Sequence, residues 1–297
     1  WLFARAHLPC FKPTSVTGAF MKFNIRHASI CLALWCLHGM AFAQVPANTA
    51  EALMRKSGIW SQLADVSTQV KAGLGQASQD GSLPPEEVQR LERIADDAFA
   101  AARLRESVLQ TLSRNVTQEQ SVDALKWFDS AEGRQITAME EAFSTNFDDM
   151  NRVMSDGNKA LAKASTKRHS LLSQTVKASK AGEAMATMEI NVTVGILQGL
   201  ASAMPHSGQG NTADFRKSFE AKRPQMVAAN GGVALTISAL TYQSASDKTL
   251  EQYVKFLSSK SGAALTASMM DAMDQSLSNA AKRLGSAIPK IPGTTSR

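Results

Sequence analysis

Histidine and cysteine, which often serve as catalytic bases, nucleophiles or metal ligands, are scarce in most of this chain. Beyond residue 43 there is no cysteine, and the histidines are His169 and His206. His169 lies in a polar stretch and His206 in a segment rich in proline and glycine, and no recognisable serine nucleophile motif accompanies either. Because a nucleophile needs a neighbouring base, we predict that both histidines are solvated surface residues and that the chain has no catalytic residue.

The acidic side chains occur largely as adjacent pairs, which are poorly placed for joint catalysis. Neighbouring residues on an α-helix point about 100° apart, so the two carboxylates of a pair diverge. Most pairs have a basic residue one helical turn away, which favours solvated ion pairs. We therefore predict no two-carboxylate active site. The pairs are Glu86-Glu87, Asp96-Asp97, Glu140-Glu141 and Asp148-Asp149.

Methionine is unusually abundant, at 13 residues in the chain, and it can bind metals. Met269, Met270 and Met273 lie close together in the sequence, and thioether sulfur can bind Cu(I). No histidine joins this cluster, and methionine is also an adaptable filler of hydrophobic cores. We therefore expect the cluster to belong to the core, and we predict neither a metal nor a cofactor.

The N-terminal segment has the features of a secretory signal peptide. From residue 21 it contains the basic residues Lys22 and Arg26, and an apolar stretch follows over residues 28–37. A stretch of about ten residues is too short to span a bilayer, which needs about twenty, so we expect no integral membrane segment after cleavage. Residues 1–20 are expected to be an upstream extension foreign to the native protein. The predicted cleavage site comprises Ala41, Ala43 and Gln44.

Cleavage at this site would change the character of the chain. It would remove all three cysteines together with four basic residues and no acidic one, which lowers the formal net charge from +6 to +2. A nearly neutral protein has no broad positive field for nucleic acid, so we predict no nucleic-acid partner. The expected location is the periplasm of a bacterium or its exterior.

Apolar residues beyond residue 43 recur with the three- and four-residue spacing of amphipathic helices, and strand patterns are scarce. We therefore expect an all-α protein. Gly73 and Gly75 are expected to end the first helix, and Pro224 to break or kink a later one. Thr117 and Gln120 form a capping-box pattern. The helix over residues 118–129 is expected to bury Val122, Leu125 and Phe128, and the helix over residues 131–154 has Phe143 and Phe147 on its apolar stripe. The expected helices cover residues 53–74, 84–109, 118–129, 131–154, 185–200, 215–240, 247–257 and 260–284.

An offset of 129 residues aligns two halves of the chain. The aligned positions keep their helix caps, glycines and apolar residues, which predicts an internal duplication. We expect two similar small helical bundles, residues 44–155 and 183–284, joined by an exposed polar helix over residues 156–182 and followed by a disordered tail, residues 285–297. The identical aligned residues include Lys126 and Lys255, Ser130 and Ser259, Gly133 and Gly262, and Thr137 and Thr266.

The most specific pattern shared by the two halves is an apolar residue, a serine two residues later and a glycine three residues after the serine. Each serine is expected to cap the following helix, and each glycine to permit close packing of the two helices around it. In this pattern each half resembles the bacterial secreted domain family of unknown function number 2059, with Ala131 and Lys260 where that family often has proline. The resemblance implies a small helical bundle, export and no established activity. The motif residues are Phe128, Ser130, Gly133, Leu257, Ser259 and Gly262.

The sequence as a whole favours an exported, non-catalytic helical binding or interaction protein. Its partner would be either another envelope protein or an apolar ligand held between helices. The alternative is an envelope hydrolase that uses scattered carboxylates. A pocket with convergent polar groups of shifted pKa would favour the hydrolase, and a broad apolar groove would favour the binding protein.

Overall fold

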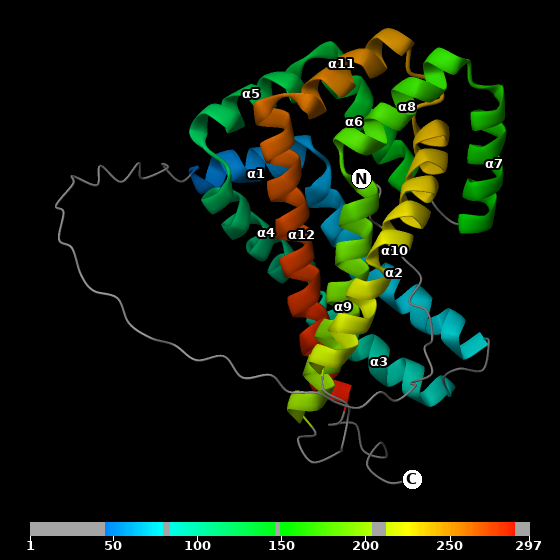
Figure 1. Cartoon of the computed structure of the whole chain (residues 1–297). Coiled ribbons are helices and arrows are strands. Elements are labelled where there is room, and N and C mark those ends of the chain that lie inside the picture. The colour runs from blue at the N-terminus through cyan, green and yellow to red at the C-terminus, as the bar shows by residue number, and fades with distance from the viewer. Residues whose placement is uncertain (1–44, 80–83, 146–148, 204–211, 289–297) are drawn as a thin grey trace, which may run out of the picture.

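The structure is a computed structural model, and it describes residues 45–79, 84–145, 149–203 and 212–288 (Figure 1). These residues form twelve α-helices and no strand, which confirms the predicted all-α fold class. Within the same residues, none of the helices has the length and apolar character that crossing a membrane requires. The predicted signal peptide, its cleavage site at Ala41, Ala43 and Gln44, and residues 1–20 lie outside the described residues, as does His206.

The helices follow one another with short connections. Their bounds are α1 Ala47–Lys56, α2 Ile59–Gln79, α3 Pro85–Ala98, α4 Ala101–Asn115, α5 Gln118–Asp129, α6 Ala131–Thr145, α7 Met150–Lys163, α8 Thr166–Ala178, α9 Ala181–Ala203, α10 Thr212–Thr241, α11 Asp247–Ser258 and α12 Lys260–Ala287.

Helices α9 and α12 run side by side through the middle of the molecule (Figure 1). Their backbones approach closely at glycines. A Cβ atom on Gly199 would lie 2.2 Å from the carbonyl oxygen of Lys282, and one on Gly285 would lie 2.1 Å from that of Ile196. Any larger residue at either position would force the two helices apart, so the glycines set their separation.

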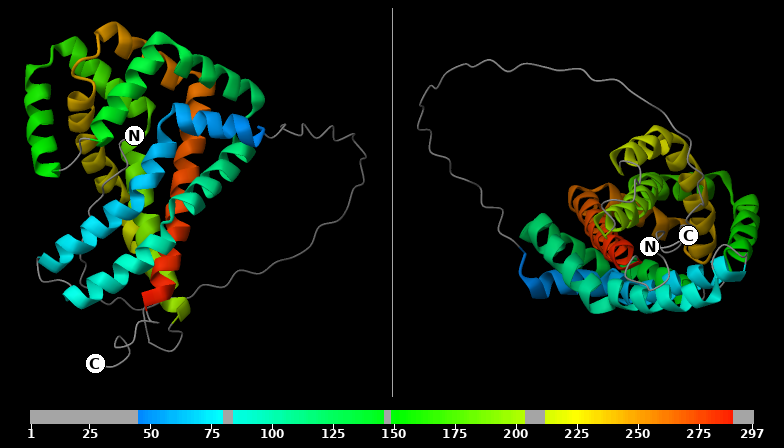
Figure 2. Two further views of the ribbon diagram at one scale, coloured as in Figure 1. Left: turned by 180° about the vertical axis from the view of Figure 1, so that it is seen from behind. Right: turned by 90° about the horizontal axis from the view of Figure 1, so that it is seen from below.

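The remaining helices are arranged around this pair. Helix α4 packs on α12 from one side and α10 packs on α9 from the other, which the view from below shows (Figure 2). Arg283 of α12 donates a hydrogen bond of 2.9 Å to the carbonyl oxygen of Ala98 at the end of α3. The largest core cluster contains residues of both halves, such as Leu104 and Leu265. The two halves therefore share one core, a point that the sequence left open.

The two repeated corners, α5–α6 and α11–α12, have matching local geometry. The Oγ atoms of Ser130 and Ser259 accept hydrogen bonds from the backbone N–H groups of Gly133 at 2.9 Å and of Gly262 at 3.0 Å. A Cβ atom on either glycine would lie 1.9 Å from a carbonyl oxygen of the preceding helix. The predicted serine caps are therefore confirmed, and each glycine is required by the close approach of two helices.

Helices α5 and α11 also begin with similar caps. Thr117 and Gln120 make the predicted capping box, with hydrogen bonds of 2.9 and 3.2 Å. Ser246 accepts a hydrogen bond of 3.0 Å from the backbone N–H of Thr249. The expected buried face of α5 is wrong in part, because Ala124 is buried whereas Val122 is 39% exposed.

Several expected helix ends differ from the structure. Gly73 and Gly75 lie inside α2, and the break falls earlier, at Gly58, whose φ of 77° ends α1. The expected helix over residues 84–109 is divided at Phe99, whose side chain is buried at the break. The expected helix over residues 131–154 is divided into α6 and α7, and Phe147 lies outside the described residues. At Phe99, the break coincides with a buried side chain, which the sequence does not reveal.

The segment 156–182 is not one exposed helix. It contains the end of α7, all of α8 and the first residues of α9, and Leu171 and Leu172 of α8 are buried. Helix α8 packs against α10 and α11, so it belongs to the fold and is not a connector. Pro224 lies within α10 and does not end it. Residues 285–287, assigned in the sequence to a disordered tail, form the end of α12, and residues 289–297 lie outside the described part.

We predict that Gly133→Ala lowers the free energy of unfolding by about 1–3 kcal/mol or more, because its Cβ atom would overlap a backbone carbonyl. The matched control is Gly73→Ala, since a Cβ atom there meets nothing within 4 Å and alanine is favoured over glycine in a helix by about 1 kcal/mol. Chemical denaturation measures both. Equal stability of Gly133→Ala and the unaltered chain would contradict the packing argument.

Candidate functional site

A cavity of about 110 Å³ lies between the two corners, where α5 and α6 meet α11 and α12. We name it the Glu140 cavity after the one charged residue among its described lining residues. Five pairs of lining residues are aligned by the 129-residue offset, so aligned positions of the two halves line the same cavity. These pairs are Trp127 and Phe256, Phe128 and Leu257, Ile136 and Leu265, Thr137 and Thr266, and Glu140 and Met269.

Glu140 lies on the buried side of α6, in line with Gly133 and Ile136, and is 4% exposed. Its Oε1 atom accepts a hydrogen bond of 2.6 Å from the hydroxyl of Tyr242 and one of 3.0 Å from the hydroxyl of Tyr253. Tyr242 directly follows α10 and Tyr253 lies on α11. One carboxyl group of the first half is thus held by two phenols of the second.

The surroundings shift the acidity of all three groups. Burial raises the pKa of the Glu140 carboxyl above its usual value, and the hydrogen bonds from the two tyrosines only partly oppose this effect. Burial, together with the nearby carboxyl, raises the pKa of Tyr242 and Tyr253 well above the usual tyrosine value. Both phenols therefore keep their protons near neutral pH and act as hydrogen-bond donors.

Aromatic rings form one side of the cavity. The Trp127 ring stacks on Phe256 with a centroid distance of 4.9 Å, and on Tyr253 with a centroid distance of 5.8 Å. Tyr242 meets Tyr253 edge to face, at 5.9 Å between centroids. Such pairs add about 0.5–1.5 kcal/mol each beyond the area that they bury. The rings therefore give the cavity a firm wall.

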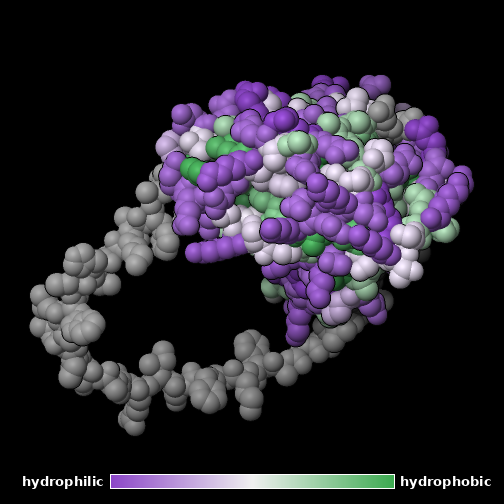
Figure 3. All heavy atoms as spheres, turned by 90° about the horizontal axis from the view of Figure 1, so that it is seen from above, coloured by the Kyte–Doolittle hydropathy of each residue, from purple (hydrophilic) through white to green (hydrophobic). Residues whose placement is uncertain are grey.

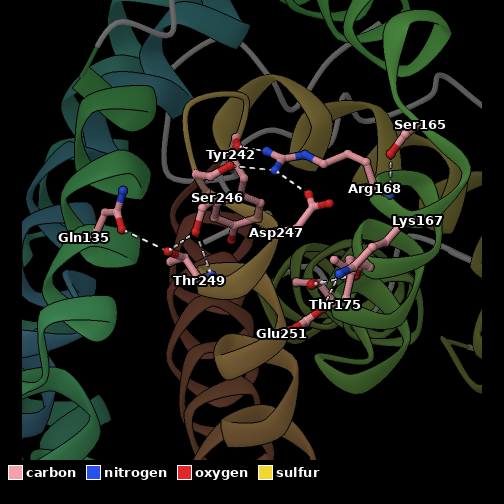
Figure 4. Close-up of polar contacts among 12 residues, drawn as sticks. Gln135, Ser165, Lys167, Arg168, Thr175, Tyr242, Ser246, Asp247, Thr249 and Glu251 are labelled. Atoms are coloured by element: carbon pink, nitrogen blue, oxygen red, sulfur yellow. Dashed lines mark hydrogen bonds and ion pairs between the residues drawn. The ribbon is translucent and has the colours of Figure 1, made fainter.

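A polar cluster on α8 fixes the turn that carries Tyr242 (Figure 4). Arg168 donates hydrogen bonds to the carbonyl oxygens of Tyr242 and Ala245 and forms an ion pair of 3.1 Å with Asp247. Across the same turn, the hydroxyl of Thr249 donates a hydrogen bond of 3.1 Å to Gln135 of α6. These contacts hold the end of α10 and the start of α11 against α6 and α8, so they position the tyrosines that hold Glu140.

The methionines that the sequence singled out line the Glu140 cavity. Met273 belongs to the largest core cluster and Met269 packs against it, which confirms the expected core role for these two residues. Met270 also lines the cavity. In the part of the chain that the structure describes, no three His, Cys, Asp or Glu side chains are grouped closely enough to hold a metal ion.

The structure brings the predicted motif residues to the edge of the cavity but adds a residue that the sequence analysis missed. Phe128 and Leu257 line the cavity, whereas the serines and glycines of the motif act in caps and close packing. Glu140 and Glu141 were predicted to be a solvated pair; this is wrong for Glu140, which is buried, and Glu141 is exposed. The missed signal was the position of Glu140 four residues after Ile136, on the apolar stripe of its helix.

Other predicted surface groups are where the sequence placed them. His169 is exposed. Asp96 pairs with Lys71 of α2 and Asp97 with Arg103 of α4, both as exposed ion pairs. The predicted exposure is therefore right for this acidic pair, but these partners come from other helices and not from one helical turn away.

Comparison with family models, curated proteins and solved structures finds no match to this chain. The chemistry of the cavity therefore has to be inferred from its own residues.

We predict that Glu140→Gln flattens the dependence of stability on pH. Because the pKa of Glu140 is raised in the folded chain, the folded state holds the proton more tightly than the unfolded state. The free energy of unfolding should therefore fall as pH rises from about 4.3, the usual glutamate value, through the raised pKa. The loss should be about 1.4 kcal/mol per unit of pKa difference, and Glu140→Gln should lack it.

Denaturant unfolding at a series of pH values measures this difference. The matched control is Glu141→Gln, since Glu141 is the exposed neighbour on the same helix. It should follow the profile of the unaltered chain. Parallel profiles for Glu140→Gln and the unaltered chain would show that burial does not shift the acidity of Glu140.

Proposed function

We propose that this chain is an exported bacterial envelope protein that binds a small, mainly apolar ligand in the Glu140 cavity without altering it chemically. The observation that carries the proposal is the composition of the cavity. Its walls are aromatic, aliphatic and methionine side chains, and a single carboxyl group, held by two tyrosines, lies among them. Ligand pockets generally combine such apolar walls with a few fixed polar groups.

The size of the cavity limits the ligand. An apolar cavity of about 150 Å³ accepts benzene, so a cavity of about 110 Å³ suits a group of about five non-hydrogen atoms. Gln62 supplies a second polar anchor, because its Nε2 atom is buried without a hydrogen-bond partner in the described structure and its residue lines the cavity. Buried donors without partners are uncommon, and a ligand acceptor would satisfy this one.

The character of the surface favours the binding of a ligand in the cavity and not the binding of a protein partner to the exterior. Seen from above, the molecule is largely hydrophilic, with small and scattered hydrophobic areas (Figure 3). Among the described residues, the one large hydrophobic side chain that counts as exposed is Val122. A protein-binding face usually has a contiguous apolar patch of several hundred Å².

The second candidate is a hydrolase, because a buried carboxyl group with a raised pKa can act as a general acid. This reading is less well supported. Hydrolysis by carboxyl groups generally uses two of them, and Glu140 is the one Asp or Glu among the described residues that line the cavity.

We propose further that the two corners arose by duplication of one exported helical unit, in keeping with the resemblance to the secreted domain family. The matching caps and glycine contacts of the corners support this origin.

Export is tested by expressing the chain from residue 21 in a bacterium and sequencing the N-terminus of the periplasmic product. We expect Gln44 as its first residue. An uncleaved chain confined to the cell interior would contradict export.

We predict that Thr266→Phe abolishes ligand binding, because its ring would fill the cavity that Thr266 lines. The probe is cyclopentane, whose five carbon atoms match the size of the cavity, and its binding is followed by the fluorescence of Trp127 and by thermal shift. The unaltered chain should show a saturable response. The control is Thr68→Phe, a substitution of the same type at an exposed position of α2, which should bind as before. No saturable response in the unaltered chain, or an unchanged response in Thr266→Phe, would refute binding in this cavity.

A further inference from the structure

We infer that the ligand of the Glu140 cavity is a small organic cation, an ammonium group with short apolar substituents, bound between the Glu140 carboxylate and the aromatic wall. The inference rests on the proposed function, because it names the class of ligand for the same site. It comes from three features of the cavity: its charge, its aromatic rings and its departure from the symmetry of the two halves.

The charge of the cavity has one sign. No Lys, Arg or His is among the described residues that line it, and Glu140 carries the one carboxyl side chain among them. The hydrogen bonds to Glu140 come from two neutral phenols. Burial disfavours the ionised form of Glu140 unless a positive charge compensates it. A cation therefore stabilises the carboxylate, whereas an anion is repelled by it and a neutral ligand gives it no compensation.

The aromatic wall suits the same ligand. Trp127, Tyr242, Tyr253 and Phe256 line the cavity together with Glu140. Aromatic rings attract a cation within about 6 Å of their centroids, most strongly when water is excluded, and pockets of several rings bind alkylated ammonium groups. The same attraction operates elsewhere in this chain, where the Arg55 guanidinium lies 4.0 Å from the ring centroid of Trp60.

The acidic group is not demanded by the packing of the corners. At the offset of 129 residues, Glu140 is equivalent to Met269, Tyr253 to Ala124 and Tyr242 to Ser113. The second corner therefore makes the same serine cap and the same glycine contact with a methionine in place of the acid. Since one corner forms without the carboxyl group, that group and its tyrosines are additions to the cavity that the corner motif itself does not require.

The test compares choline with 3,3-dimethyl-1-butanol, which has the same shape but a carbon atom in place of the charged nitrogen. Both can accept a hydrogen bond from Gln62 through the hydroxyl oxygen. Isothermal titration calorimetry on the purified chain should show choline binding at least tenfold more tightly than the alcohol. Glu140→Gln should remove this tenfold preference, and Glu141→Gln, at the exposed neighbouring position, should keep it.

Glu140→Met provides the same test should Glu140→Gln not fold, since methionine is the residue at the equivalent position of the other corner. Equal affinity for choline and the alcohol, or a preference that survives loss of the carboxyl group, would overturn the cation and leave ligand binding in the cavity standing. Absence of saturable binding for both probes, and for cyclopentane as well, would overturn the cation and the proposed function together.

Discussion

A carboxyl group inside an apolar core must be held by hydrogen bonds, because burying it unpaired costs several kcal/mol. In this protein the donors come from the other half of the chain: Tyr242 and Tyr253 both donate to one oxygen of Glu140. The contact fixes α6 against the end of α10 and against α11, and it lies beside the cavity between the two corners. The shape of the cavity and the acidity of its one carboxyl group both depend on this interaction.

The rest of the fold serves to hold that junction. The glycines of α9 and α12 let these two central helices approach closely. Residues of α12, such as Leu265 and Met269, also line the cavity. Arg168 fixes the turn after α10 from the side of α8. A site built on packed helices in this way is held more firmly than one built on loops, which suits a cavity that has to keep its shape for a small ligand.

Local interactions made part of the structure predictable. The caps at Thr117, Ser246 and Ser259 could be read from the sequence, because each one joins residues three positions apart. The packing of Gly133 and Gly262 followed from glycine at a position where it weakens an isolated helix. These features depend on neighbours in the chain, so the sequence contains the information directly.

The site itself could not be predicted in the same way. Glu140 was taken for a surface residue because its neighbour Glu141 is acidic, and its tyrosine partners lie 102 and 113 residues further along the chain. Only the folded arrangement brings them together. Whether the two halves share a core stayed open in the sequence for a similar reason, since Leu104 and Leu265 belong to one core cluster but lie far apart in the chain.

The most direct measurement of the central interaction is a carbon-13 NMR titration of the Glu140 side-chain carboxyl in the folded protein, assigned by comparison with Glu140→Gln. The account requires this signal to titrate above the ordinary glutamate range, because burial raises the pKa of the carboxyl. A signal that titrates with the exposed glutamates would show that Glu140 is solvated and that the two tyrosines do not hold it inside the core.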